Sequence, residues 1–408
     1  MKKYALILLL ALLGTIVPAA AAAAEAPTAR LIVDGIELIA DVPPTIMNNR
    51  TLVPFRAIAE ALGVSVTWHA ESRSILASGQ GKSLQLVLDQ TTALVNGASR
   101  QMDVAPQLVR NRTMVPARLF AEAFGATVTW DAPTRTAYVR SAVRPMETLA
   151  FYGLGSYEWR HYIPRFAGVA YTWSMLDQSG QLTLTEVPYY WPEGADEVLT
   201  LAQESLTDRY LTVIAGDADD RVTNLVLDPA ARERLAGQIE AVLTEQGLEG
   251  VVIDLEGLGL ELEGTALERV REGYVALLES VSARLKPLRK QVIAAVHPPN
   301  GWYPGYDYTA IATSVDRVLI MAHDYNPAES TDPEPLDQVE EAVRMSVALI
   351  PPEKLLLGIL MEHENRESVI QKVSLAKRYN LAGISIWILR SLDQEEMEAI
   401  ETLVSPAR

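Results

Sequence analysis

Eight short apolar segments alternate with amphipathic stretches across residues 147–405, and this alternation limits the fold more than any other feature. Apolar, β-branched runs of this length are typical of strands buried in a parallel sheet. The candidate strands are Leu149–Leu154, Phe166–Trp173, Tyr210–Ala215, Gly250–Glu256, Gln291–His297, Arg317–Ala322, Lys354–Ile359 and Gly383–Leu389. The candidate helices are Ala195–Leu206, Ala230–Gln246, Leu267–Leu288, Pro335–Leu349, Glu367–Tyr379 and Gln394–Leu403.

Eight such strands predict an α/β domain, a (β/α)8 TIM barrel over residues 147–405. The alternative is an open, doubly wound sheet. That fold would carry a glycine-rich phosphate turn after its first strand, and none is evident in the sequence.

Residues 31–140 contain an internal repeat with an offset of 62 positions, too regular to arise by chance. The matching positions are Val33-Asp34-Gly35 with Val95-Asn96-Gly97, Asp41 with Asp103, Asn49 to Pro54 with Asn111 to Pro116, Arg56 with Arg118, Gly63 with Gly125, and Trp68 with Trp130. Each unit predicts short strands, a helix closed by a glycine (Phe55 to Leu62 and Ala117 to Phe124), and a strand that ends at tryptophan. We therefore expect a small N-terminal α+β domain, built from a tandem repeat, over residues 25–142. We interpret Trp68 and Trp130 as core residues.

The first 24 residues are typical of a secretory signal peptide. Lys2 and Lys3 precede an apolar stretch from Ala5 to Val17, and a run of alanines up to Ala24 offers a cleavage zone. The apolar stretch is short for a membrane span of about 20 residues, which favours cleavage over anchoring. We expect the mature protein to be secreted or associated with the cell wall.

Charge and cysteine content exclude several classes of partner. The formal net charge of −17 argues against nucleic acid and anionic lipid. The chain has no cysteine, so neither a disulfide framework nor a zinc–thiolate site can form.

The segment Gly250–Glu256 is the strongest candidate for chemistry, because its apolar run ends in two carboxylates. Side chains alternate along a strand, so Val252, Asp254 and Glu256 share one face. The two carboxylates then lie roughly 6–7 Å apart, close enough to perturb each other's protonation. The C-terminal end of a barrel strand is where such enzymes place their catalytic groups.

This strand resembles the chitinase-like glycoside hydrolase family 18, whose signature is D-G-x-D-x-D-x-E. Residues Glu249 to Glu256 read Glu-Gly-Val-Val-Ile-Asp-Leu-Glu. Met321-Ala322-His323-Asp324-Tyr325 resembles the family motif M-x-Y-D, and Gly383 to Trp387 resembles the segment whose tryptophan floors the sugar-binding subsite. The resemblance implies catalytic Glu256 and Asp254, with substrate contacts from Met321, His323, Asp324, Tyr325 and Trp387, and it implies neither a cofactor nor a metal.

The same resemblance implies a retaining, substrate-assisted mechanism. The 2-acetamido oxygen of N-acetylglucosamine would attack C1, while Glu256 protonates the leaving oxygen and later activates water. Asp254 would orient the acetamido group.

Two residues depart from the family pattern. Val252 replaces a buried aspartate, and His323 replaces a tyrosine that would donate to the acetamido carbonyl. A neutral imidazole can donate from one nitrogen, so the role can survive with new pH sensitivity. For His323 a hydrogen-bonded core role is an equal alternative, and for Trp387 core packing is a lesser one.

Other polar and aromatic residues near the strand ends have structural interpretations. We expect His297 to be structural. The aromatic loop that contains Trp302, Tyr303, Tyr306 and Tyr308 suits either glycan stacking or plain packing. The acidic loop at Asp217, Asp219 and Asp220 could suggest calcium, but we favour a solvated loop.

Residues 28–141 resemble the copper amine oxidase N-terminal-like domain, which often forms a stalk in secreted bacterial proteins. The Asn-Arg-Thr-x-Val-Pro turn and the Gly-x-x-Val-Thr-Trp strand carry the resemblance. Copper is not implied, because His69 is the only histidine of the region.

The sequence thus predicts a secreted glycosidase that hydrolyses a glycan containing N-acetylglucosamine, either peptidoglycan or a chitin-like polymer. One alternative is a catalytically silent, lectin-like barrel with a stalk that attaches to the cell wall. Another makes the tandem repeat itself the working part, as a wall-anchoring module.

Overall fold

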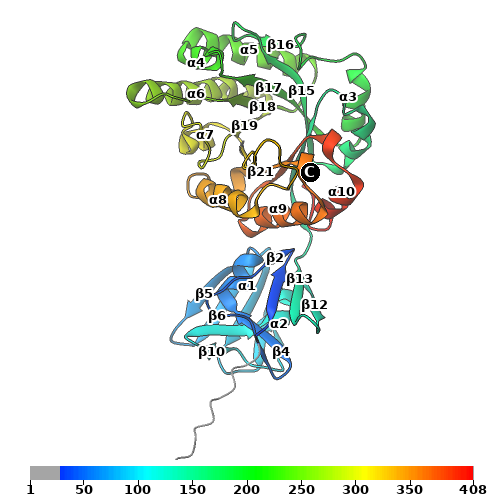
Figure 1. Ribbon diagram of the computed structural model, residues 1–408, viewed down its shortest axis with the longest axis vertical. Coiled ribbons are helices and arrows are strands. Elements are labelled where there is room, and N and C mark those ends of the chain that lie inside the picture. Colours follow the sequence, from blue (N-terminus) through cyan, green and yellow to red (C-terminus); the bar gives the residue numbers. More distant parts are fainter. Residues whose placement is uncertain (1–27, 408) are drawn as a thin grey trace, which may run out of the picture.

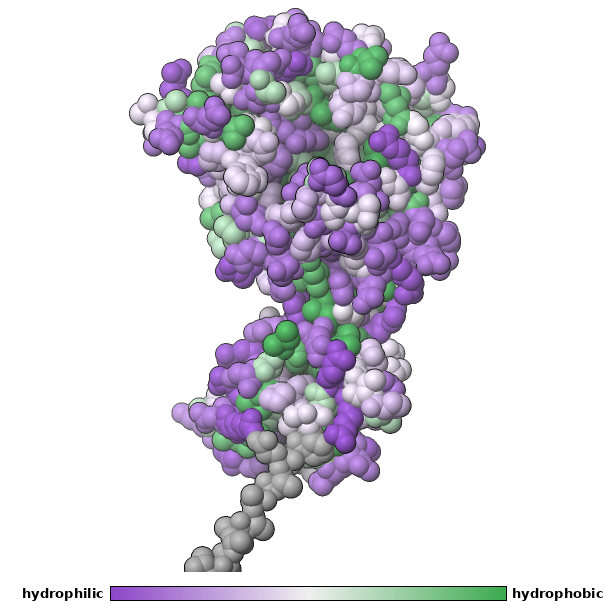
Figure 2. Space-filling model, in the orientation of Figure 1, coloured by the Kyte–Doolittle hydropathy of each residue, from purple (hydrophilic) through white to green (hydrophobic). Residues whose placement is uncertain are grey.

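The computed structural model describes residues 28–407, which form two domains joined at a narrow waist (Figures 1 and 2). The predicted signal peptide lies outside the described residues. Among the residues that are described, no helix is both long and apolar enough to cross a membrane.

The larger domain is a closed barrel of eight parallel strands, which confirms the predicted fold class. In chain order the barrel strands are β14 (Arg144–Tyr152), β15 (Gly168–Leu176), β17 (Asp208–Gly216), β18 (Gly250–Glu256), β19 (Gln291–Val296), β20 (Arg317–Met321), β21 (Leu355–Leu360) and β22 (Gly383–Trp387). Each pairs in parallel with the next, and β14 closes the barrel by pairing with both β22 and β15. A short strand, β23 (Val404–Pro406), pairs in parallel with the first residues of β14.

Helices surround this barrel, and the six predicted helices all form. They are α3 (Ala195–Glu204), α5 (Pro229–Glu245), α6 (Gly264–Leu285), α8 (Leu336–Val347), α9 (Arg366–Arg378) and α10 (Gln394–Glu401). Two short helices, α4 (Arg221–Leu227) and α7 (Tyr308–Ser314), were not predicted, because about two turns are too short for a clear apolar period. Between β14 and β15 the chain forms only a 3-10 helix, η1 (Tyr157–Arg165).

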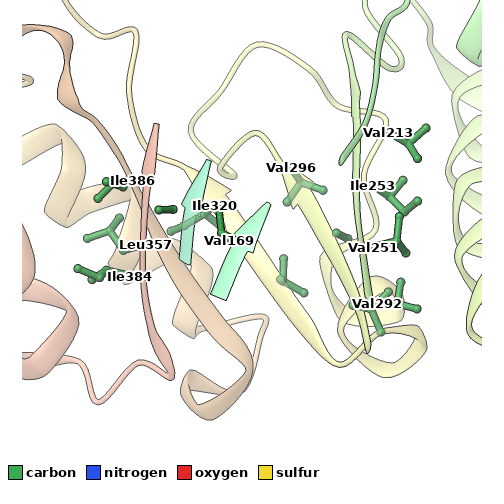
Figure 3. Close-up of a cluster of buried hydrophobic side chains, with 14 of the residues drawn as sticks. Val169, Val213, Val251, Ile253, Val292, Val296, Ile320, Leu357, Ile384 and Ile386 are labelled. Carbon is green, nitrogen blue, oxygen red and sulfur yellow. The ribbon is translucent and has the colours of Figure 1, made fainter. Parts of the chain in front are cut away.

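Side chains alternate between the two faces of each strand and so form two apolar layers. Side chains such as Val251, Ile253 and Ile384 point outward against the helices (Figure 3). The opposite face fills the barrel interior with a second cluster that includes Val252, Leu319 and Met321. The predicted sharing of one face by Val252, Asp254 and Glu256 follows from this period of two.

The smaller domain contains the duplicated unit. Its repeated elements are β1 (Arg30–Val33), β2 (Ile36–Glu37), β3 (Thr45–Met47), β4 (Arg50–Pro54), α1 (Phe55–Ala61), β5 (Ser65–His69) and β6 (Ser74–Gly79), followed by β8 (Thr92–Val95), β9 (Ala98–Gln101), β10 (Gln107–Val109), β11 (Arg112–Pro116), α2 (Ala117–Ala123), β12 (Thr127–Asp131) and β13 (Thr136–Arg140). The extra strand β7 (Lys82–Val87) lies between β6 and β8 and breaks the symmetry.

The two repeats interlock about a pseudo-twofold axis. Strands β4 and β11 pair antiparallel, with Val53 opposite Val115, which are equivalent positions of the two repeats. Two ion pairs cross this axis reciprocally: Arg112 binds Asp41, and Arg50 binds Asp103. Because each repeat completes the other, the duplicated sequence forms one domain.

Our interpretation of Trp68 and Trp130 as core residues is wrong. Their side chains are 39% and 41% exposed. Each lies near the end of a strand whose earlier residue on the same face, Val66 or Val128, packs against the core. The tryptophans extend past that core to the surface.

The domains contact each other through the tight turn between β1 and β2. The backbone carbonyls of Asp34 and Gly35 accept hydrogen bonds from Ser374 Oγ (3.1 Å) and Gln371 Nε2 (3.0 Å) on α9. Burial lowers the pKa of Lys377, on the same helix, to about 8, and its ammonium donates to the carbonyl of Ala142 (2.8 Å). The predicted boundary segment, residues 142–147, is therefore partly held by the barrel.

Candidate active site

The two predicted catalytic carboxylates lie at the C-terminal end of β18, and they differ in exposure. Asp254 is buried, whereas the side chain of Glu256, at the strand tip, is 42% exposed. Glu249, which precedes the strand at its opposite end, pairs with Arg209 (2.8 Å) and serves the structure. The exposed carboxylate is thus the one that can meet a substrate.

One carboxylate oxygen of Asp254, Oδ1, lacks a hydrogen-bond partner among the described residues. Burial, followed by the nearby charge of Glu256, raises the pKa of Asp254 well above its ordinary value. Val252, which precedes it on the same face, contributes only apolar surface from the barrel interior. Burial therefore favours the neutral form of the Asp254 carboxyl.

His297 stands beside Glu256, which our structural interpretation of this histidine did not anticipate. It directly follows β19, and its Nε2 lies 3.4 Å from Glu256 Oε2. That nitrogen is buried and makes no hydrogen bond within residues 28–407. The ring packs against Tyr303 with centroids 4.4 Å apart. The sequence signal that could have identified His297 as a site residue is its position directly after a barrel strand.

The segment after β20 carries His323, Asp324 and Tyr325. His323 Nδ1 lies 2.9 Å from Asp324 Oδ2, and this hydrogen bond is the main cause that lowers the pKa of Asp324. The charge of His297 lowers the pKa of Asp324 further. Tyr325 donates its hydroxyl hydrogen to Asn300 Oδ1 (3.1 Å).

The pairing with Asp324 changes what His323 can do. If Nδ1 carries the hydrogen that binds the carboxylate, a neutral ring leaves Nε2 as an acceptor. Donation from Nε2 to an acetamido carbonyl then requires the imidazolium. Asp324 is suited to stabilise that cation, because it stays ionised.

A buried network supports this segment. The backbone N–H groups of Asp324 and Tyr325 donate to the two carboxylate oxygens of Glu334, at 3.0 and 3.1 Å. Lys372 donates to the backbone carbonyl of Glu334 (3.0 Å) and to Glu364 Oε2 (2.6 Å), in an ion pair that is almost wholly buried. Sequence reasoning missed these residues, because they lie on separate loops and on α9.

Met321 and Trp387 form an apolar floor. Met321 is buried among the interior side chains, and Trp387 packs half-buried on the same cluster, 5.0 Å from the ring of Phe151. The indole is thus held by packing while part of it stays exposed, as a sugar platform needs.

A cavity of about 430 Å³ adjoins Glu256. Tyr303 and Asp217 lie on its wall. In the aromatic loop, Trp302 is 88% exposed, whereas Tyr306 is buried and donates to the carbonyl of Leu255. This loop both packs and presents an exposed ring.

The acidic loop after β17 is engaged in local structure. Asp217 accepts hydrogen bonds from the N–H (2.8 Å) and hydroxyl (2.5 Å) of Thr223, and Asp219 pairs with Arg221. Within residues 28–407, no group of three or more acidic or histidine side chains could hold a metal ion.

A carboxylate pair at the mouth of a closed β/α barrel, above an apolar floor that holds a half-exposed tryptophan, defines a glycoside hydrolase of the chitinase-like class. Residues 148–363 match the Glycosyl hydrolases family 18, and residues 32–139 match the Copper amine oxidase N-terminal domain. The chain therefore belongs to glycoside hydrolase family 18, with a copper amine oxidase N-terminal domain before the barrel.

Relatives agree with this assignment. The putative sporulation-specific glycosylase YdhD of Bacillus subtilis (strain 168) is 26% identical over 150 residues, which cover 35% of this chain and 34% of that protein. The chain thus matches about a third of the length of this curated relative.

Two solved structures share the fold. The spore cortex-lytic enzyme SleL of Bacillus cereus has a TM-score of 0.55 at 16% identity, over 66% of this chain and 76% of its own. A chitinase from Chromobacterium violaceum has a TM-score of 0.54 at 17% identity, over 63% of this chain and 98% of its own.

Proposed function

We propose that this protein is an exported glycosidase that cleaves β-linked glycans containing N-acetylglucosamine, with peptidoglycan as the favoured substrate. The observation that carries the proposal is the pairing of buried Asp254 with half-exposed Glu256 at the tip of β18. Substrate-assisted hydrolysis needs one acid and one anion at this position.

The carboxylate pair supplies both. Burial, and after it the charge of Glu256, raises the pKa of Asp254 and so favours its protonated form. An acetamido N–H that donates to the unpartnered Asp254 would stabilise its anion, so that Glu256 can hold the proton.

The reaction then proceeds in two steps. The acetamido oxygen attacks C1 while the bond from C1 to the leaving oxygen breaks, and Glu256 gives its proton to that oxygen. The resulting oxazolinium ion lies beside the Asp254 anion. Glu256 next takes a proton from water as the water oxygen attacks C1, which restores the acetamido group and retains the configuration.

Relatives favour this class of substrate. A plant class V chitinase mutant from Cycas revoluta, with a TM-score of 0.52 to this chain at 16% identity, is described in complex with (GlcNAc)3. The names of YdhD and SleL connect related barrels with sporulation and the spore cortex. With the signal-peptide pattern of residues 1–24, these likenesses favour peptidoglycan over chitin.

Product analysis tests the proposal. The protein is incubated with purified peptidoglycan and with chitooligosaccharides, and products are identified by mass and by reducing end. We expect cleavage after N-acetylglucosamine, and loss of about 10²–10⁴-fold in turnover for Glu256→Gln, with binding and fold preserved. Full activity of Glu256→Gln would refute the assignment of Glu256. Binding without turnover by the natural chain would favour the lectin-like alternative.

A further inference from the structure

The N-terminal domain carries two grooves that are related by its pseudo-twofold axis. Groove A contains Phe55, Arg56, Trp68, Asn111 and Arg112 and encloses about 620 Å³. Groove B, of about 360 Å³, contains the equivalent residues of the other repeat, namely Ala117, Arg118, Trp130, Asn49 and Arg50. We propose that both grooves bind segments of an acidic glycan.

Each groove is assembled from both repeats. Groove A takes its tryptophan and helix start from the first repeat and its Asn-Arg-Thr turn from the second, and groove B does the reverse. The ion pairs Arg112–Asp41 and Arg50–Asp103 fix the two turns. In Figure 1, β5 and β10 lie on one flank of the domain and β12 and β4 on the other, so the grooves face different directions.

The side chains in the grooves suit a sugar that carries a carboxylate. The half-exposed indoles of Trp68 and Trp130 offer faces on which a pyranose ring can stack. Arg56 and Arg118 are both exposed, and neither makes a side-chain hydrogen bond or ion pair within residues 28–407. A guanidinium without a protein partner is suited to bind a carboxylate in bidentate fashion.

The net charge of the N-terminal domain differs from that of the barrel. Residues 28–141 hold 11 Lys and Arg against 9 Asp and Glu, a net charge of +2, within a chain whose net charge is −17. The barrel therefore repels a polyanion at long range, whereas the N-terminal domain does not. An acidic glycan is the partner that fits this distribution, and it would hold the enzyme on its polymer while the barrel acts.

A binding assay tests the proposal. Its surface is densely coated with peptide-free peptidoglycan strands, whose muramic acid carboxylates are free. All chains carry Glu256→Gln, so that the probe is not consumed. Two linked sites can raise the avidity of a chain by about 10²–10⁴-fold. We expect Trp68→Ala with Trp130→Ala to weaken binding on the order of 10²-fold. Each single change should already cause most of this weakening, because one remaining groove no longer has the gain in avidity that two linked sites give. Arg56→Gln with Arg118→Gln should weaken binding and reduce its salt dependence.

Tyr138→Ala is the matched control, because this exposed aromatic residue lies in the same domain but outside both grooves. It should bind as the Glu256→Gln parent does. The arginine variants change only exposed side chains and remain informative if the tryptophan variants fold poorly. Equal binding by the parent and the arginine variants, or equal binding to a surface coated with chitooligosaccharide, would overturn the acidic-glycan assignment.

Cleavage rates distinguish the proposal about the grooves from the proposed function of the barrel. With Glu256 intact, the paired tryptophan variant should cleave a short soluble substrate at a rate within about twofold of the natural chain, because the grooves lie outside the barrel. Loss of surface binding with retained cleavage supports the grooves. Binding unchanged in both paired variants would refute them, whatever the barrel hydrolyses.

Discussion

His297 Nε2 lies 3.4 Å from Glu256 Oε2, at the ends of two neighbouring parallel strands. No residue between 28 and 407 hydrogen-bonds this nitrogen, so the imidazole is free to respond to the charge on Glu256. In the proposed mechanism Glu256 passes its proton to the leaving group and becomes an anion, and a nearby imidazole could stabilise that charge.

We expect His297→Gln to lower kcat by about 10-fold or more, because the glutamine amide cannot become positively charged. The dependence of kcat on pH should also change, since a glutamine amide, unlike an imidazole, cannot take up or release a proton beside Glu256. Steady-state kinetics between pH 4 and 9 measure both effects. His69→Gln, an exposed histidine of the N-terminal domain, is the control. An identical pH profile for both variants would return His297 to a packing role.

Asp254→Asn should impair turnover but stabilise the fold at neutral pH. Burial raises the pKa of Asp254 in the folded state above its value of 3.8. The protonated carboxyl therefore stabilises the native state fully below about pH 4, and that contribution is lost as pH rises through the raised pKa. Asparagine cannot ionise, so its advantage in free energy of unfolding should grow between pH 4 and 8. Urea titrations at both pH values measure it, and a constant difference would contradict the raised pKa.

His323→Tyr restores the hydroxyl donor of the family motif and should retain activity. A tyrosine donates without first taking up a proton, so the variant should keep its rate at alkaline pH better than the natural chain does. Asp324→Asn should have the opposite effect, because the imidazolium loses its anionic partner. Rate measurements on a verified substrate compare the three chains. Equal profiles for all of them would assign His323 to structure alone.

Removing one partner of the ion pair between Lys372 and Glu364 should lower the free energy of unfolding strongly. Replacing both residues with apolar ones should lower it much less. Lys372→Met leaves the buried Glu364 carboxylate unpaired, and such a loss costs about 3–5 kcal/mol in free energy of unfolding. Lys372→Met together with Glu364→Leu should recover most of that stability. Thermal and urea unfolding test this expectation. Restored stability without restored kcat would identify the network as a positioning device for residues 323–325.

Much of the architecture could be predicted from local patterns. The strand Gly250–Glu256 was predicted with the bounds that β18 has, because its apolar run and its flanking glycine are local signals. The 62-residue repeat likewise gave α1 and α2 to within one residue at their ends. Segments with weak periodicity, such as α4, α7 and η1, were missed.

The sequence by itself determined which residues share a face, because strand geometry alternates every two positions wherever the strand lies. It therefore placed Asp254 and Glu256 together and, with the family motif, gave the class of enzyme. Only the tertiary structure decided that His297 stands beside Glu256, that Glu334 holds the loop of His323, and that Trp68 and Trp130 reach the surface. These relationships join residues on different strands, loops or repeats. They depend on how the barrel closes and how the repeats cross, which no local period records.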